Sequence, residues 1–251
     1  MPEGKQLYLF GTIHMPIDSV EWHSGIVYNL IRDSVAYYGE MDLSQIQEGY
    51  NGSNLISGGK TIEECFPGTK KYKKVRTAIL KAFNVDLEQH KYLKPILIQH
   101  IIDKNISRGD GEIMDYHLWK YMESEKIPGY GLESFKDQID ILESIDLDYQ
   151  ISILKTISRS TSKYKKKVEK MIGLYNRQDI ISLYKTGAKS CGKYRKLIIH
   201  QRNLNMVDKI LKIQHERAFV SVGIGHLYGQ KGILAGLKRN GAKLKPMTSQ
   251  D

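Results

Sequence analysis

Short apolar runs alternate with longer amphipathic stretches along the chain, and four of these runs end in glycine or in a carboxylate. Residues 7–10 and 218–222 precede Gly11-Thr12-Ile13-His14 and Gly223-Ile224-Gly225-His226, and residues 35–41 and 127–133 carry Glu40 and Glu133 at their ends. Runs of this length, rich in β-branched and aromatic residues, predict buried strands. Each Gly-x-x-His sequence therefore begins where a predicted strand ends.

The apolar positions between these runs recur with helical spacing. This spacing predicts helices over residues 21–34, 71–83, 93–104, 113–125, 148–171, 179–184, 192–216 and 227–238, with shorter ones over 61–65 and from about 134 onward. Alternation over residues 242–247 predicts a final strand. The expected fold class is α/β, bordering on α+β: a small mixed β-sheet flanked by many helices. We expect a single domain over residues 1–251, with a helical, basic insert at roughly 148–216.

The net charge of +10 is concentrated in one part of the chain. Residues 155–196 contain 13 Lys or Arg against two acids, a net charge of +11, which leaves the rest of the chain at −1. Such a segment is able to contact phosphate backbones or anionic lipid headgroups, but a solvated helix face is the more ordinary interpretation. We expect no nucleic acid partner.

The sequence excludes some classes of protein and leaves the compartment open. No apolar stretch reaches the roughly 18 residues that a membrane-spanning helix needs, so no transmembrane segment is expected. We expect a soluble protein that is cytoplasmic if the chain is complete, and in the envelope or secreted if a leader was removed. Cys65 and Cys191 form no CxxC pair and favour neither a disulfide framework nor a thiolate zinc site.

Two glycine-rich segments resemble nucleotide-binding loops, and neither has the required spacing. The loop from Gly49 to Lys60 leads into Gly59-Lys60-Thr61, but the glycine that a phosphate-binding loop needs five positions earlier is Asn54. The segment 223–229 has one residue too many before its last glycine for a dinucleotide fingerprint, and no acid follows about 20 positions later. We therefore expect no nucleotide cofactor.

The four strand ends bring two imidazoles and two carboxylates: His14, Glu40, Glu133 and His226. Ligands gather outside the carboxyl ends of strands in open α/β sheets, so these side chains are expected to converge. Such a set suits a divalent ion such as zinc, manganese or cobalt. A bound ion lowers the pKa of water toward roughly 7, and a free carboxylate can act as general base.

Several short sequences together resemble one protein family, over nearly the whole chain and in the same order. They are Leu9 to His14, Gly131-Leu132-Glu133-Ser134 with Gln138, Arg202-Asn203 with Met206, and Gly223 to Leu227 with Gly229; Met114-Asp115 and Tyr175-Asn176 also match. This set is similar to the TraB/GumN family, which includes pheromone-shutdown proteins and the Tiki proteins. The resemblance implies a fold like that of the Tiki proteins and the erythromycin esterases.

The resemblance also implies roles for individual residues. The paired Gly-x-x-His sequences nominate His14 and His226 as metal ligands or catalytic groups, and the strand-end carboxylate nominates Glu40 as a third ligand. Glu133, Arg202 and Asn203 are implied as further catalytic residues. Arg202 would either stabilise an oxyanion or clamp a carboxylate, or form a structural ion pair with Glu133. Tiki-like relatives imply manganese or cobalt as the ion, and zinc stays a third option.

Two functions remain open at this point. The first is a metal-dependent hydrolase, most simply a metallopeptidase that acts on a peptide or protein substrate. The second is a peptide-binding protein of the same fold, which sequesters its ligand without cleaving it, as the pheromone-shutdown relatives suggest.

Overall fold

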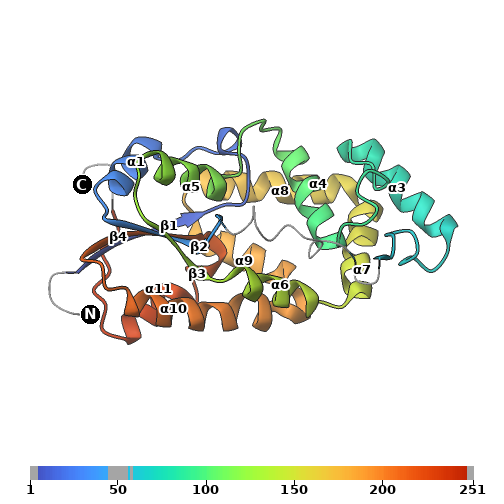
Figure 1. Ribbon diagram of the computed structural model, residues 1–251. Helices are drawn as coiled ribbons and strands as arrows, with labels where there is room; N and C mark the ends of the chain where they lie inside the picture. Colours follow the sequence, from blue (N-terminus) through green and yellow to red (C-terminus); the bar gives the residue numbers. More distant parts are fainter. Residues whose placement is uncertain (1–4, 45–55, 57–58, 248–251) are drawn as a thin grey trace.

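A four-stranded sheet lies at one end of the molecule, in the computed structural model that describes residues 5–44, 56 and 59–247 (Figure 1). Its strands are β1 (Gln6–Thr12), β2 (Ala36–Met41), β3 (Gly129–Glu133) and β4 (Arg217–Gly223), in the spatial order β1-β4-β2-β3. The last strand of the chain is thus an inner strand, paired with β1 on one side and β2 on the other. All four strand predictions are confirmed.

The pairing within this sheet is parallel throughout. The α/β fold class is therefore confirmed, whereas we had expected a mixed sheet. The prediction of a strand over residues 242–247 was wrong, because those residues form no strand. Ala242 and Leu244 instead pack their side chains against the core beside β4. Alternating burial without a backbone partner produced the pattern of a strand.

Helices make up most of the remaining chain. Their bounds are α1 (Ser24–Arg32), α3 (Thr69–Phe83), α4 (Pro95–Ser107), α5 (Met114–Ser124), α6 (Phe135–Glu143), α7 (Leu147–Arg159), α8 (Thr161–Asn176), α9 (Ile180–Ser190), α10 (Arg202–Lys212) and α11 (Ile233–Arg239). Shorter elements are the 3₁₀ helices η1 (Ile17–Ser19), η3 (Gly192–Tyr194) and η5 (Ile224–His226) and the π-helix η4 (Lys196–Gln201).

Several helix predictions were wrong in their bounds. The helix expected over 192–216 is the 3₁₀ helix η3, the π-helix η4 and α10, which ends at Lys212, and α9 continues to Ser190, beyond the expected end at residue 184. The helix expected over 148–171 is two helices, α7 and α8, that meet at Ser160. The helix expected from residue 227 begins only at Ile233, because Gly229 adopts a φ of +99° that ends the preceding turn. Residues 62–65 form turns in place of the expected short helix. Most of the glycine-rich loop from Gly49 to Lys60 lies outside the described residues.

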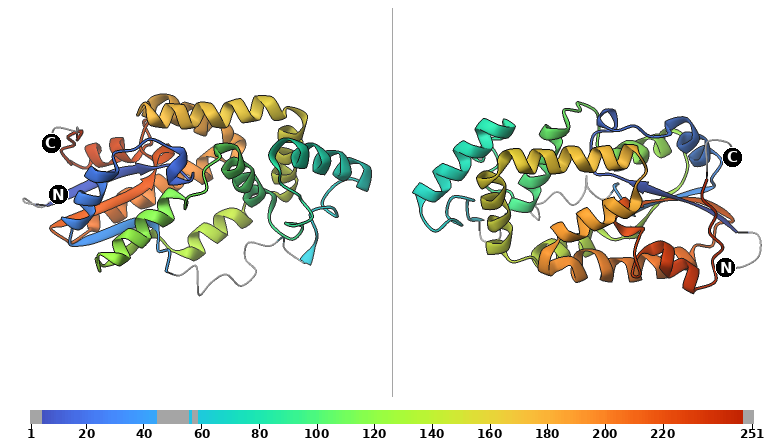
Figure 2. Two further views of the ribbon diagram at one scale, coloured as in Figure 1. Left: turned by 90° about the horizontal axis from the view of Figure 1, so that it is seen from above. Right: turned by 180° about the vertical axis from the view of Figure 1, so that it is seen from behind.

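The sheet is covered by helices on both faces and continued by helices at one end. Helices α1 and α5 pack on one face, and α10 and α11 cover the other (Figures 1 and 2). The side chains of β4 alternate accordingly: Phe219 joins the core under α1 and α5, while Val220 and Val222 join the core with α10 and α11. The helices α3, α4, α7 and α8 extend beyond the carboxyl ends of the strands.

None of the helices within the described ranges has the length and apolarity that a bilayer crossing requires. Cys65 and Cys191 are both free thiols.

Candidate functional site

The two Gly-x-x-His sequences lie side by side, because the strands that precede them are neighbours in register. Thr12 at the end of β1 pairs with Gly223 at the end of β4. On the other side of β4, Glu40 of β2 accepts a hydrogen bond from the backbone N–H of Gly223, with a distance of 2.8 Å to Oε2. Glu133 is the last residue of β3, and Met41 is its partner on β2. The sheet therefore brings the four predicted strand ends to one edge.

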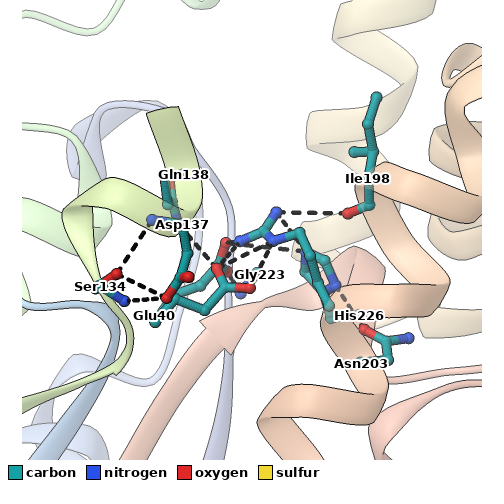
Figure 3. Close-up of polar contacts among 10 residues, drawn as sticks. Glu40, Ser134, Asp137, Gln138, Ile198, Asn203, Gly223 and His226 are labelled. Carbon is teal, nitrogen blue, oxygen red and sulfur yellow. Dashed lines mark hydrogen bonds and ion pairs between the residues drawn. The ribbon is translucent and has the colours of Figure 1, made fainter. Parts of the chain in front are cut away.

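Arg202 connects three of these strand ends (the surrounding contacts are drawn in Figure 3). Its Nε lies 3.0 Å from both carboxylate oxygens of Glu133, and its Nη2 lies 2.6 Å from Glu133 Oε2. The same Nη2 donates a short hydrogen bond to Oε1 of Glu40, and Nη1 lies 3.3 Å from Nε2 of His226. Arg202 is therefore the ion-pair partner of Glu133, as one of the two open interpretations proposed, and also of Glu40.

Glu40 is held in its ionised form. Burial alone would raise the pKa of this carboxyl, but the charge of Arg202, together with His226 and the N–H of Gly223, lowers it to about 2. Glycine leaves room for this close approach of backbone and carboxylate, since a Cβ at position 223 would lie 3.2 Å from Oε2 of Glu40, a tight contact. Gln138 of α6 completes the set by donating to Glu133 Oε2 at 3.1 Å.

His226 is neutral and fixed in orientation by Asn203. Its Nδ1 lies 2.6 Å from Oδ1 of Asn203 (Figure 3). The amide nitrogen of Asn203 donates to the carbonyl of Lys231 at 2.7 Å. An amide oxygen only accepts, so Nδ1 carries the proton and Nε2 keeps its lone pair. Burial lowers the pKa of His226, and Arg202 adds to this, against the opposing charges of Glu40 and Glu133. Nε2, which Nη1 of Arg202 approaches at 3.3 Å, faces Glu40 Oε1 at 3.9 Å.

The first turn of α10 delivers both Arg202 and Asn203 to this cluster. Helix α10 buries Asn203, Met206, Val207 and Ile210 along one face, which fixes its rotation against the sheet. The turn that precedes Arg202 is the π-helix η4, a rare element that occurs frequently at functional sites. The sequence carried no signal for it, since a π-helix and an α-helix differ in hydrogen-bond register and not in apolar spacing.

His14 belongs to a second group of side chains that sequence reasoning did not assemble. Its Nδ1 lies 3.5 Å from Oδ2 of Asp115 in α5, and the other oxygen of Asp115 accepts a 2.6 Å hydrogen bond from Thr12. The ring of His14 also meets that of His100 of α4 edge to face. Desolvation lowers the pKa of His14, but the hydrogen bond and charge of Asp115, followed by Glu40 and Asp103, raise it on balance.

Asp115 is thus the site residue that the sequence analysis missed as a partner. It stood only within the pair Met114-Asp115 of the family resemblance, and nothing in its local pattern links it to His14 or Thr12. The 103 positions between Thr12 and Asp115 are bridged only by the fold.

The predicted metal ligands are of the chemical types that bind an ion, but they are not arranged around one common point. Glu40 is ionised and His226 keeps a free lone pair, which are the states in which these side chains bind metals. However, within the described part of the chain no three His, Cys, Asp or Glu side chains lie close enough together to hold an ion. His14 makes its contacts with Asp115 and His100, and the guanidinium of Arg202 touches the binding atoms of both Glu40 and His226.

Comparison with known proteins adds a family but no close relative. No curated protein and no solved structure matches the chain. The model of the TraB/PrgY/gumN family matches residues 2–246, which is nearly the whole sequence. The match spans both Gly-x-x-His sequences, all four strands and the turn that carries Arg202 and Asn203. The chain therefore belongs to the TraB/PrgY/gumN family.

Proposed function

We propose that this protein is a hydrolase of peptides or proteins and that it depends on a divalent ion, manganese, cobalt or zinc. Glu40 and His226 are the proposed ligands, with His14 from the neighbouring strand as the third. The active site of this proposal is the carboxyl edge of β1, β4 and β2.

One observation carries the proposal: an ionised carboxylate and a neutral imidazole, 3.9 Å apart between Oε1 of Glu40 and Nε2 of His226, end neighbouring parallel strands. Metal-binding histidines commonly use their other ring nitrogen in a hydrogen bond that fixes the tautomer. Asn203 makes this bond to His226 and directs Nε2 toward Glu40. The backbone N–H of Gly223 orients Glu40 in the same way.

The chain also offers a group for proton transfer beside this pair. The side chain of His14 is 62% exposed, so water and substrate can reach it. Nδ1 of His14 lies 3.5 Å from Asp115, which is itself fixed by Thr12, so Nε2 is the nitrogen that remains to act as a base. His14 would take a proton from the attacking water and return it to the leaving amine. This role is the alternative to that of third ligand, because a ring nitrogen that binds the ion has no lone pair left for a proton.

Metal binding and turnover test this proposal. Calorimetric titration of metal-stripped protein with Mn²⁺, Co²⁺ and Zn²⁺ should give one site in the wild type, lost in His226→Ala and weakened in His14→Ala. His90→Ala, a histidine in the turns between α3 and α4, serves as the control and should bind normally. Peptide-library cleavage should follow metal occupancy and stop on chelation. Full cleavage by both His14→Ala and His226→Ala would sink the proposal.

The second candidate function is peptide sequestration. A pocket of about 350 Å³ adjoins Arg202 and is lined by charges of both signs, including Lys209, Asp137, Asp140 and Asp208. Such a lining is able to receive the terminal charges of a peptide. Stoichiometric binding of a peptide that is recovered uncut, with or without metal, would favour this function over hydrolysis.

A further inference from the structure

The guanidinium of Arg202 occupies the two atoms that an ion at this site would need. Nη2 donates to Oε1 of Glu40, and Nη1 lies 3.3 Å from Nε2 of His226. These are the carboxylate oxygen and the imidazole nitrogen that face each other at 3.9 Å. A divalent ion and the guanidinium therefore cannot both bind this pair of atoms.

Charge balance points in the same direction. Glu40, Glu133 and Arg202 are largely buried, with side chains 21%, 4% and 12% exposed. With Arg202 in place, the two carboxylates and the guanidinium carry a net charge of −1. Without it, two carboxylates would face each other in a region of low dielectric, which is strongly unfavourable. A divalent ion added beside the guanidinium would place two cations in contact instead.

Arg202 has an anchor that does not depend on Glu40. Glu133 binds both Nε and Nη2, and Gln138 donates to Glu133, so the guanidinium keeps a carboxylate partner if it leaves Glu40. The remaining contact, from Nη1 to the carbonyl of Ile198 in the π-helix η4, is long at 3.5 Å. The side chain is thus held firmly on the side of β3 and loosely on the side of η4.

We propose that Arg202 is an internal counter-cation, whose guanidinium fills the Glu40–His226 pair in the free protein and is displaced onto Glu133 when a divalent cation binds. Arg202 then sets the threshold concentration at which the site takes up an ion. This inference rests on the proposed function, because it assigns the cation site to the same two residues.

Replacing the guanidinium should tighten cation binding. We expect Arg202→Gln to bind Mn²⁺ at least about tenfold more tightly than the wild type in calorimetric titration, since a competing charge-assisted contact is removed. Lys209→Gln is the matched control: it removes one positive charge from the same helix, at an exposed position that lines the neighbouring pocket. Its affinity should stay at the wild-type value, also in the presence of 0.5 M salt, roughly where exposed charges are screened.

A second variant keeps the test interpretable if Arg202→Gln does not fold. Arg202→Gln leaves two buried carboxylates without a cation, whereas the double variant Arg202→Gln/Glu133→Gln keeps the net charge of the cluster. Circular dichroism identifies which of the two is folded, and the gain in affinity should appear in the folded one. Equal or weaker Mn²⁺ binding in a folded variant would overturn the inference, because Arg202 would then only position the site.

The outcomes separate this inference from the proposed function. If the wild type binds Mn²⁺ and the variants bind no better, the metal site stands and the counter-cation does not. If only the variants bind, the counter-cation stands, and the wild-type protein is not an enzyme that uses Mn²⁺ at this site. Absence of binding in the wild type and in folded variants overturns both.

Discussion

Glu40 shows how a few contacts decide the charge of a buried group. Burial opposes its ionisation, yet Arg202 and the N–H of Gly223 lower its pKa to about 2. The strand-end position of Glu40, and of Glu133 and His226, was predictable from the sequence, because an apolar run followed by a polar residue is a local signal. The pairing of His14 with Asp115 was not, since neither residue differs locally from an ordinary surface group.

Removing the charge of Glu40 should change the response of the protein to acid. A folded-state pKa below the unfolded value of 4.5 contributes stability that is present above pH 4.5 and is lost as the pH falls toward 2. The shift corresponds to about 3 kcal/mol at neutral pH. We expect Glu40→Gln to be less stable at pH 7 and to lose less stability between pH 5 and pH 3 than the wild type.

Chemical denaturation at several pH values measures this difference. The lowered pKa of His226 acts in the same direction but at higher pH, since it contributes stability that is lost as the pH falls below 6.5. Asp86→Asn is the comparison far from the site: Arg76 lowers the pKa of Asp86 to about 2, and Asp86 lies between α3 and α4. It should show the same change in acid response without involving the site. Parallel stability curves for Glu40→Gln and the wild type would contradict the prediction.

At the scale of elements, α8 connects the helices that extend beyond the strand ends (α3, α4, α7 and α8) with the first Gly-x-x-His sequence. The hydroxyl of Tyr175, near the end of this helix, donates to the carbonyl of Gly11 at 2.9 Å and lies 3.2 Å from the sulfur of Met114. The elements themselves were largely predictable from apolar spacing. The ends of some helices were not predictable. At Gly229 a glycine ends a turn, and in η4 the hydrogen-bond register changes, and neither event alters the apolar spacing.

Tyr175→Phe isolates the hydrogen bond between α8 and β1. The phenyl ring keeps the packing, so we expect a loss of about 1 kcal/mol in the free energy of unfolding, the usual contribution of one hydrogen bond. Urea denaturation measures this, with Tyr92→Phe, at an exposed position outside the helices, as the neutral control. If the position of β1 also sets that of His14, metal affinity should fall in Tyr175→Phe alone. Unchanged stability would show that Tyr175 acts through packing only.

At the scale of the whole molecule, the excess positive charge is concentrated in one run of helices. The segment 155–196 runs from the end of α7 through α8, α9 and η3 into η4. Several of its cations already have partners: Lys193 pairs with Asp146 at 2.7 Å, Lys167 donates to Ser190, and Lys155 lies over the ring of Phe66. These contacts within the protein favour a solvated helix face over a surface that binds the phosphates of a nucleic acid.

We therefore predict that the protein does not bind nucleic acid at physiological salt. Fluorescence anisotropy with labelled single-stranded and double-stranded oligonucleotides should show at most weak association at low salt, which disappears by about 150 mM as screening increases. Reversal of charge at Lys165 and Lys166 provides the comparison. Tight binding at 150 mM salt that these changes abolish would assign the segment to a nucleic acid partner.

The position of β4 has a consequence for how the protein comes into being. The strand synthesised last fills the gap between β1 and β2, so β1 has no partner until some 220 residues have been made, whereas β2 is able to pair with β3 earlier. During synthesis β1 therefore waits as an unpaired strand, and folding through contacts of such high sequence separation is slow. Loss of only the last fifty residues would remove β4 together with Arg202, Asn203 and His226, so the site forms only when both ends of the chain are present.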